Sequence, residues 1–193
     1  MKTYLIIIHI CIIVLSNILV AIPLEFYGFK ITWAAFSFPL VIVTTDLTTR
    51  LIGKSLAQNI IGYSFPFAIL SSIILLYLNE NTISVSIRIG IASGIAYAIG
   101  VLIDINAFQF IREKYSNWWI APALSTIISN IIDSYIFFFS AFYSSEDLYM
   151  AKNWLEICGT QTLIKILIGF IFFLPVYGVL LNLFLKKINA KKN

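Results

Sequence analysis

The stretch WWIAPALSTIISNIIDSYIFFFSAFY, residues 118–143, decides the fold class. As a helix it is long enough to cross about 30 Å of hydrocarbon, and several similar apolar runs accompany it. Of the 193 residues, 60% are hydrophobic and 11% charged, whereas soluble domains average about 45–50% apolar and about 25% charged residues. A single domain of this size cannot bury so much apolar surface in water, so lipid must be part of its solvent.

The apolar runs are continuous, whereas the strands of a membrane barrel would alternate in short segments. They cover residues 4–22, 32–49, 59–78, 83–110, 118–143 and 154–185. The sequence therefore predicts an all-α integral membrane protein, a bundle of six transmembrane helices in a single transporter domain over residues 1–193. We expect the last helix to be tilted or broken at Pro175. Alternatively, the first run is a signal peptide, which would leave five spans.

Lysine and arginine accumulate in the cytoplasmic loops of membrane proteins. At one set of helix ends lie Lys2, Arg50, Lys54, Arg112, Lys114, Lys186, Lys187, Lys191 and Lys192. The opposite ends carry a comparatively acidic set, namely Glu25, Lys30, Glu80, Glu146, Asp147 and Lys152. This alternation predicts that both termini are cytoplasmic. It also accounts for the net charge of +4 without a nucleic-acid partner.

A charge within hydrocarbon is unfavourable unless it is paired or hydrated, so ionisable residues inside the runs are the first places to look for function. In the second run Asp46 and Arg50 lie four residues apart, on the helical face that also carries Pro39. We expect an acid–base pair there. It is either a salt bridge that anchors the cytoplasmic end of the helix or part of a ligand-binding or gating site.

The fifth and sixth runs carry further polar residues. A stripe on the fifth run is formed by Pro122, Thr126, Ser129, Asn130 and Asp133. We expect it to face other helices or a cavity, because a polar stripe facing lipid is unfavourable. On the sixth run, a buried Lys165 requires a carboxylate, and Asp133 and Glu156 are the candidates. Alternatively, the stripe on the fifth run only forms hydrogen bonds between helices, and Lys165 forms a structural ion pair that has no role in substrate binding.

Signatures of catalysis are missing from the sequence, which has no HExxH, GxSxG or P-loop motif. One histidine, His9, and two separated cysteines, Cys11 and Cys158, predict neither a metal site nor a disulfide framework. Small residues in the fourth run are typical of close helix packing, and Asp104 lies near the cytoplasmic end of that run. The pattern predicts a transporter without a cofactor or metal, with a small hydrated site inside the bilayer.

Four strings are more specific: FPLVIVTTDLTTRLIG at 38–53, residues 118–143 as quoted above, NWLEI at 153–157 and FLPVYGVLLNL at 173–183. Together, over residues 32–187, they resemble the bacterial queuosine precursor transporters of the vitamin-uptake-transporter-like family. The motif residues of the family map onto Asp46, Arg50, Gly53, Trp118, Trp119, Pro122, Ser125, Thr126, Asn130, Asp133, Asn153, Trp154, Glu156, Pro175, Tyr177 and Gly178.

The resemblance implies a six-span protein of the bacterial inner (cytoplasmic) membrane. It would import 7-cyano-7-deazaguanine and 7-aminomethyl-7-deazaguanine for salvage of queuosine in tRNA. The chain is also similar in architecture to the substrate-binding components of energy-coupling-factor transporters. The alternative is therefore a substrate-binding membrane subunit that needs separate ATPase and scaffold proteins. Such energy-coupling subunits, or a homo-oligomer, are the protein partners left open, and an intramembrane enzyme is a third hypothesis.

A guanine-like edge offers adjacent N–H donors that one carboxylate accepts together, and a carbonyl that accepts from an amide or ammonium group. Asp133 or Glu156 could take the first role, and Asn130, Gln161 or Lys165 the second. An aromatic ring would stack on the base. We expect the site between the second, fifth and sixth runs. The candidate substrate-binding residues are Asp46, Arg50, Trp119, Asn130, Asp133, Trp154, Glu156, Gln161 and Lys165.

Overall fold

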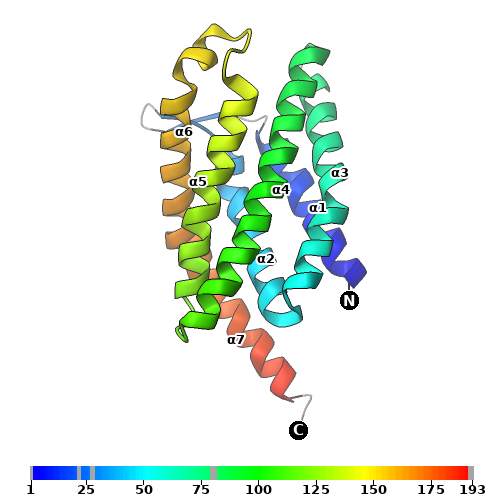
Figure 1. Ribbon diagram of the computed structural model, residues 1–193, viewed down its shortest axis with the longest axis vertical. Helices are drawn as coiled ribbons and strands as arrows, with labels where there is room; N and C mark the ends of the chain where they lie inside the picture. The colour runs from blue at the N-terminus through cyan, green and yellow to red at the C-terminus, as the bar shows by residue number, and fades with distance from the viewer. Residues whose placement is uncertain (1, 21–22, 27–28, 79–81, 191–193) are drawn as a thin grey trace.

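A computed structural model describes residues 2–20, 23–26, 29–78 and 82–190, and most of its helices run along one common axis (Figure 1). In chain order the elements are α1 (Lys2–Val20), β1 (Pro23–Phe26), β2 (Phe29–Thr32), α2 (Ala34–Ile52), α3 (Lys54–Leu78), α4 (Ile83–Lys114), α5 (Ile120–Phe142), α6 (Leu148–Ile168), η1 (Gly169–Phe173) and α7 (Leu174–Ala190). The π-helical turn η1 joins α6 to α7 without a break. The described residues therefore form six helical rods and one hairpin.

Four of these rods are long and apolar enough to cross a membrane, by length and composition over the described residues. They are α3, α4, α5 and the continuous stretch Leu148–Lys186. The predicted helical, membrane-embedded class is confirmed at this level, whereas the count of six spans stays a prediction. The more polar character of α2 comes from Thr44, Thr45, Asp46, Thr48, Thr49 and Arg50.

Helix α4 shows why lipid has to be the solvent of this fold. Its large apolar side chains at four-residue spacing point outward and are exposed, namely Ile87, Ile91, Ile95 and Ile99. Its small residues face the protein. A Cβ added at Gly90 would lie 2.4 Å from the side chain of Ile73 on α3, and a Cβ added at Gly94 would lie 2.1 Å from the side chain of Ile69 on the same helix. Small residues inside and large apolar residues outside are typical of helices packed within a membrane. The predicted packing role of this surface is confirmed.

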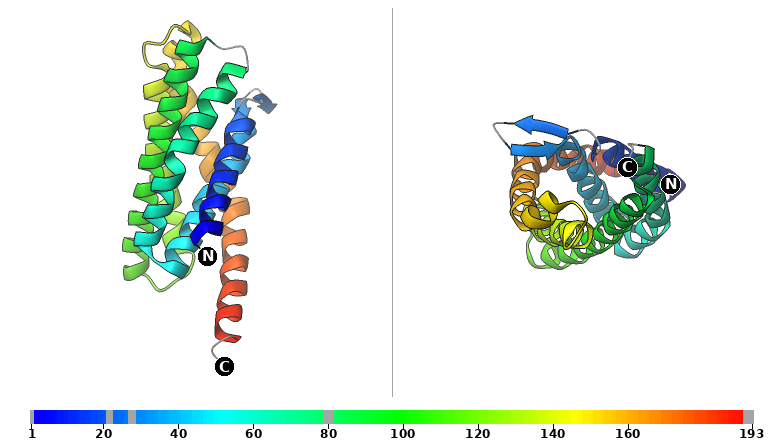
Figure 2. Two further views of the ribbon diagram at one scale, coloured as in Figure 1. Left: turned by 90° about the vertical axis from the view of Figure 1, so that its right-hand side faces the viewer. Right: turned by 90° about the horizontal axis from the view of Figure 1, so that it is seen from above.

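The helices pack around α2. Helix α4 lies between α3 and α5, α6 packs against α5, and α1 packs against both α2 and α3. Helix α2 itself contacts α1, α3, α4, α6 and α7, and the view from above shows it toward the inside of the bundle (Figure 2). A buried apolar cluster joins α2, α4, α5 and α7 through Val43, Leu47, Phe108, Ile111, Ala121, Tyr177 and Leu181.

Both termini lie at the same end of the bundle, and α7 extends beyond the other helices there (Figure 1). The turn from α2 to α3 and the last turn of α4 lie at this end as well. The last turn of α2 carries Arg50, and the last turn of α4 carries Arg112 and Lys114. The arrangement matches the alternation of loop charges, while the side of the membrane that this end faces stays a prediction.

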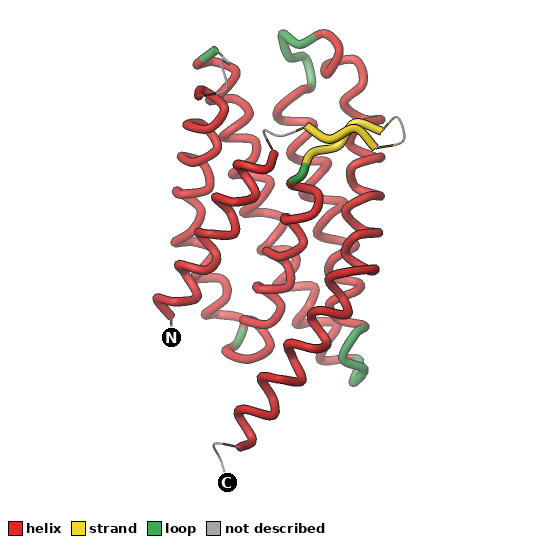
Figure 3. Tube along the Cα trace, turned by 180° about the vertical axis from the view of Figure 1, so that it is seen from behind, coloured by secondary structure: helices red, strands yellow, loops and turns green. Residues whose placement is uncertain are grey.

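The connection from α1 to α2 contains a β-hairpin that the sequence analysis did not predict. The strands pair antiparallel, with Pro23 opposite Thr32 and Glu25 opposite Lys30. Figure 3 shows the hairpin crossing the outer side of the bundle, nearer the end opposite the termini. With four residues in each strand, the period-two pattern is too short to stand out from a loop.

The expected break at Pro175 takes the form of the π-helical turn η1. The backbone N–H of Leu174 donates to the carbonyl of Gly169, five residues earlier. Pro175 has no N–H to donate, and its ring would clash with a carbonyl four residues back in a regular α-helix. Widening the preceding turn relieves this conflict, so the helix continues past Pro175 instead of ending there.

Candidate functional site

A small pocket opens between α2, α5, η1 and α7, which belong to the three runs between which the site is expected. Its cavity volume is about 20 Å³, which is close to the room that one water molecule needs. The lining residues are Ile42, Val43, Asp46, Pro122, Ala123, Thr126, Gly169, Phe170, Phe173, Leu174 and Tyr177. The pocket is thus apolar and aromatic on the side of η1 and α7, and it has one carboxylate on α2.

Asp46 faces Asp104 of α4 behind the pocket wall. The two side chains are 1% and 0% exposed, and their carboxyl groups lie within hydrogen-bonding distance of each other. The hydroxyl of Ser129 donates to Asp104 Oδ1 over 3.4 Å, and the hydroxyl of Ser125, which donates to the carbonyl of Pro122, lies near the same carboxyl group. The other oxygen of each pair member, Asp46 Oδ1 and Asp104 Oδ2, accepts no hydrogen bond from any described residue.

The predicted ion pair between Asp46 and Arg50 is wrong for the residues that the structure describes. Arg50 instead turns toward α7, where its Nη1 atom lies 3.5 Å from the hydroxyl of Tyr177. The Tyr177 ring stacks on Trp118 at a centroid distance of 6.4 Å and an interplanar angle of 20°. A spacing of four residues permits contact along α2, but the neighbouring helices offer each side chain a different partner.

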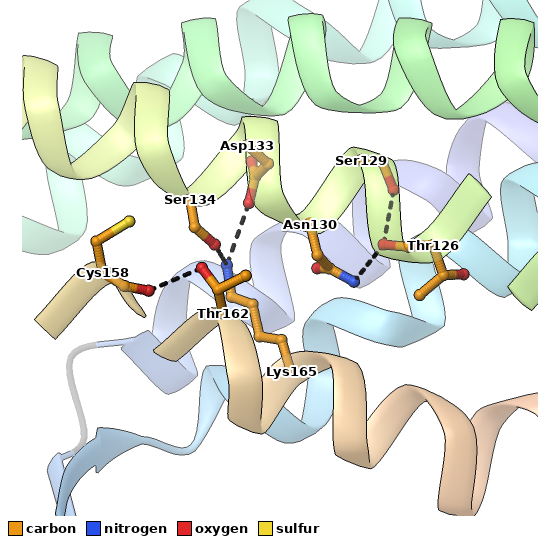
Figure 4. A network of polar contacts seen from close by, with 8 residues as sticks. All are labelled: Thr126, Ser129, Asn130, Asp133, Ser134, Cys158, Thr162 and Lys165. Atoms are coloured by element: carbon orange, nitrogen blue, oxygen red, sulfur yellow. Dashed lines mark hydrogen bonds and ion pairs between the residues drawn. The ribbon is translucent and has the colours of Figure 1, made fainter. Parts of the chain in front are cut away.

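The polar stripe of α5 points into the bundle, as expected (Figure 4). Ser129, Asn130 and Asp133 are buried, and Thr126 and Pro122 line the pocket. The Asn130 amide donates to the carbonyl of Thr126 over 2.9 Å, while its Oδ1 atom has no partner among the described residues. The stripe therefore leads from the pocket along α5, one helical turn at a time, toward Asp133.

Lys165 of α6 pairs with Asp133 at the far end of this stripe (Figure 4). Its Nζ atom lies 3.1 Å from Asp133 Oδ2 and 3.2 Å from the hydroxyl of Ser134. Only 14% of the Lys165 side chain and 7% of the Asp133 side chain are exposed. Of the two carboxylates considered for Lys165, Asp133 is the partner, whereas Glu156 is exposed.

The remaining candidates lie apart from the pocket. Trp119 is 46% exposed, and Gln161 is half-buried on α6. Trp154 packs its ring against the aromatic rings of Tyr135, Phe139 and Tyr143 at the other end of α5. Of the candidate residues, the structure places Asp46 in the pocket lining and pairs Lys165 with Asp133 farther along α5, with Asn130 between them on that helix. It places Trp119, Trp154, Glu156 and Gln161 outside the pocket lining.

Sequence reasoning missed the pairing of Asp46 with Asp104. Each acid stands out as an ionisable residue inside an apolar run, but nothing in the spacing says which helices meet at that depth. His9 is also buried, at 1% exposure, and neither ring nitrogen has a partner in the described part of the chain. Across the described ranges, no group of three or more His, Cys, Asp or Glu residues is placed to hold a metal ion.

Comparison with known proteins adds independent findings. Residues 32–180, which include every residue of the pocket lining, match the family described as "Putative vitamin uptake transporter". The "Queuosine precursor transporter" of Escherichia coli (strain K12) is 40% identical over 195 residues, which cover 95% of this chain and 87% of the relative. The "Probable queuosine precursor transporter" of Haemophilus influenzae is 36% identical over 203 residues, which cover 93% and 86%. No solved structure matches the chain.

Proposed function

Since the chain belongs to the vitamin uptake transporter family, we propose that it imports queuosine precursors across the bacterial inner membrane. The substrates we propose are 7-cyano-7-deazaguanine and 7-aminomethyl-7-deazaguanine. The proposal is carried by one observation: the chain is similar, along nearly its whole length, to relatives that are named as queuosine precursor transporters. The same comparisons confirm the family resemblance expected from the four strings, and they confirm that the chain is a transporter and not an enzyme.

The chemistry of the pocket supports a deazaguanine ligand. We assign the adjacent N–H donors of the base to Asp46, whose Oδ1 atom has no partner among the described residues and which lines the pocket. The rings of Phe170, Phe173 and Tyr177 line the same pocket and offer faces on which the base can stack. Such stacking contributes about 1–3 kcal/mol per base in other nucleobase sites.

Beyond the pocket, the stripe on α5 offers a polar route between the helices. Asn130 lies one turn from the pocket residue Thr126, and Lys165 lies one turn from the pocket residue Gly169. The free Oδ1 atom of Asn130 and the Lys165–Asp133 pair can therefore contact a base that moves along this face. We propose Asp46, Asn130, Asp133 and Lys165 as the substrate-contacting set.

The size of the cavity bears on how a substrate is admitted. A volume of about 20 Å³ is too small for a bicyclic base, since pockets for small molecules generally measure about 300–1,000 Å³. Import therefore requires α2 and α5 to move apart from the η1 and α7 wall. The π-helical turn η1 forms part of that wall, and such turns are frequent at functional sites.

Uptake by proteoliposomes that contain only this chain tests the proposal. Vesicles preloaded with unlabelled 7-cyano-7-deazaguanine should exchange it for external labelled base, and unlabelled 7-aminomethyl-7-deazaguanine should compete while adenine should not. Asp46→Asn should lose most of the exchange, because the amide replaces one of the two acceptor oxygens with an NH2 group, which is itself a donor and cannot pair with the N–H groups of the base. Glu146→Gln is the matched control, since Glu146 is exposed in the loop between α5 and α6.

The outcomes separate the transporter from its alternative. If the purified chain binds labelled base but does not exchange it across the vesicle membrane, it is a substrate-binding subunit that needs other components. If it neither binds nor exchanges either base, the proposed substrate class is wrong. If adenine competes as well as the deazaguanines, the assignment of Asp46 to the guanine-like edge fails.

A further inference from the structure

We propose that Asp46 and Asp104 form a proton-binding site whose occupancy is coupled to substrate binding, so that a proton gradient drives import. The proposal rests on the proposed function and adds its source of energy. The geometry behind it is a pair of buried carboxyl groups on α2 and α4, one lining the substrate pocket and the other behind it.

Each of the two carboxyl groups has an oxygen that accepts no hydrogen bond from the part of the chain that the structure describes. A proton bound to the pair would turn one carboxyl group into a donor for the other. Asp46 Oδ1 and Asp104 Oδ2 are fully buried and have no partner among the described residues. The two groups nevertheless lie within hydrogen-bonding distance of each other. Two ionised carboxylates at this separation repel each other, whereas one proton held between them satisfies both groups.

Among the residues that the structure describes around the pair, no cation takes the place of this proton. On α2, Arg50 turns toward Tyr177 of α7, and on α4 Arg112 reaches the backbone carbonyl of Arg50 over 3.5 Å. Helix α5 contributes the uncharged hydroxyls of Ser125 and Ser129, while the charges of α5 and α6 farther along are paired with each other. Within the described part of the chain, neither carboxyl group forms an ion pair.

Coupling follows from the different positions of the two acids. Asp46 lines the pocket and Asp104 does not. Ionised Asp46 accepts the N–H donors of the base, and the one proton of the pair then resides on Asp104, whose Oδ1 atom accepts from the hydroxyl of Ser129. A doubly protonated pair leaves Asp46 a poor acceptor, and a doubly ionised pair is repulsive. The base is therefore carried with one proton, and no bond of the substrate is made or broken.

Transport assays in proteoliposomes distinguish coupling from transport itself. With the membrane potential clamped by valinomycin and equal potassium, an external pH one unit below the internal pH should drive accumulation of labelled 7-cyano-7-deazaguanine up to about tenfold for one proton per base. Asp104→Asn should keep the exchange of internal for external base and lose this accumulation. Glu113→Gln, an exposed acid on the same helix, should keep both.

Each result bears on the proposal. Exchange by the native chain without accumulation in the gradient overturns the coupling and leaves the proposed function intact, whereas absence of exchange overturns both. Accumulation by Asp104→Asn overturns the assignment of the proton to this pair. If Asp104→Asn also loses exchange, Ser129→Ala decides, because it keeps both acids and removes one donor to Asp104. Its pH of half-maximal uptake should rise, and an unchanged pH profile overturns the proposal.

Discussion

Lys165 and Asp133 carry opposite charges inside apolar helices, so each side chain needs the other. Lys165→Ala leaves Asp133 buried without a cation and should lower the free energy of unfolding by about 3–5 kcal/mol. The double variant Lys165→Ala, Asp133→Ala should recover most of this loss, because it removes both charges. The free energies of unfolding of the native chain, the single variant and the double variant are measured in mixed micelles by titration with sodium dodecyl sulfate.

Lys152→Ala is the matched control for this series, since Lys152 lies on the same helix and is exposed. If the double variant is as unstable as Lys165→Ala, the Lys165–Asp133 ion pair does not account for the loss of stability. Uptake then separates the two readings left open by the sequence. Recovery of stability without recovery of uptake places the pair in the substrate path, and recovery of both makes the pair structural.

Gly100 permits the close approach of α4 to the same aspartate. A Cβ added there would lie 2.8 Å from Asp133 Cβ, an atom fixed to the backbone of α5. Gly100→Ala should therefore destabilise the protein by about 1–3 kcal/mol. At Gly159, nothing lies within 4 Å of an added Cβ, so Gly159→Ala should stabilise α6 by about 0.5–1 kcal/mol. Equal effects of the two substitutions on the unfolding midpoint would contradict this account.

Single residues also show how far a sequence can predict partners. The requirement that Lys165 meet a carboxylate follows from its position in an apolar run, and the pairing with Asp133 confirms it. The spacing of Asp46 and Arg50 suggested a pair that does not form, because contacts between helices outweigh a contact along one helix. The meeting of Asp46 with Asp104 depends on how α2 and α4 are placed relative to each other, which hydrophobic periodicity does not specify.

At the scale of elements, Arg88 of α4 holds the end of α5. Its guanidinium group donates to the carbonyls of Ser140, Tyr143 and Ser144, and Ser144 has the left-handed φ of 53°. A cation at the C-terminal end of a helix satisfies unpaired carbonyls and interacts favourably with the helix dipole. Arg88→Gln should cost about 1 kcal/mol of stability.

Hydrogen exchange measures this effect locally. The backbone amides of residues 143–147 should exchange faster in Arg88→Gln, while amides in the middle of α5 should be unchanged. Ser84→Ala is the control, because Ser84 is exposed on the same helix. Unchanged exchange across residues 143–147 would mean that the turn is held by other contacts.

Element boundaries were predictable where composition changes sharply and were less accurate elsewhere. The start of α4 agrees with the expected run, and α5 differs by two residues at its start. Helix α6 begins six residues earlier than expected, because the Asp147 side chain caps it by accepting from the backbone N–H of Met150. An apolar run predicts only the part of a helix that crosses lipid. Polar turns that extend the helix beyond the lipid are not predicted by the run.

For the whole molecule, orientation in the membrane is the open prediction. Loop charges predict that the end with both termini faces the cytoplasm. In a chain from which Cys11 and Cys158 have been removed, a cysteine beside Glu146 should react with an impermeant thiol reagent in intact cells. A cysteine beside Lys191 should react only after the cells are opened. The reverse pattern would contradict the orientation, and labelling of both positions in intact cells would contradict the six-span count.

At this scale the sequence predicted the class of the protein best. Composition required lipid, and the polar stripe of α5 indicated which helix faces the interior. The order of packing around α2 required the structure, because every helix of a membrane bundle is apolar outside and the driving force for association lies in small residues and buried polar contacts.

The π-helical turn η1 has one more consequence, for how substitutions along the last rod should be compared. A turn that holds an additional residue shifts the angular phase of everything after it by about 100°, the rotation of one residue in an α-helix. Lys165, which precedes the turn in α6, therefore follows one periodicity, and Tyr177 and Leu181, which come after it in α7, follow another that is offset from the first. Deleting a single residue within Gly169–Phe173 would bring the two halves into one phase and rotate Tyr177 away from Arg50.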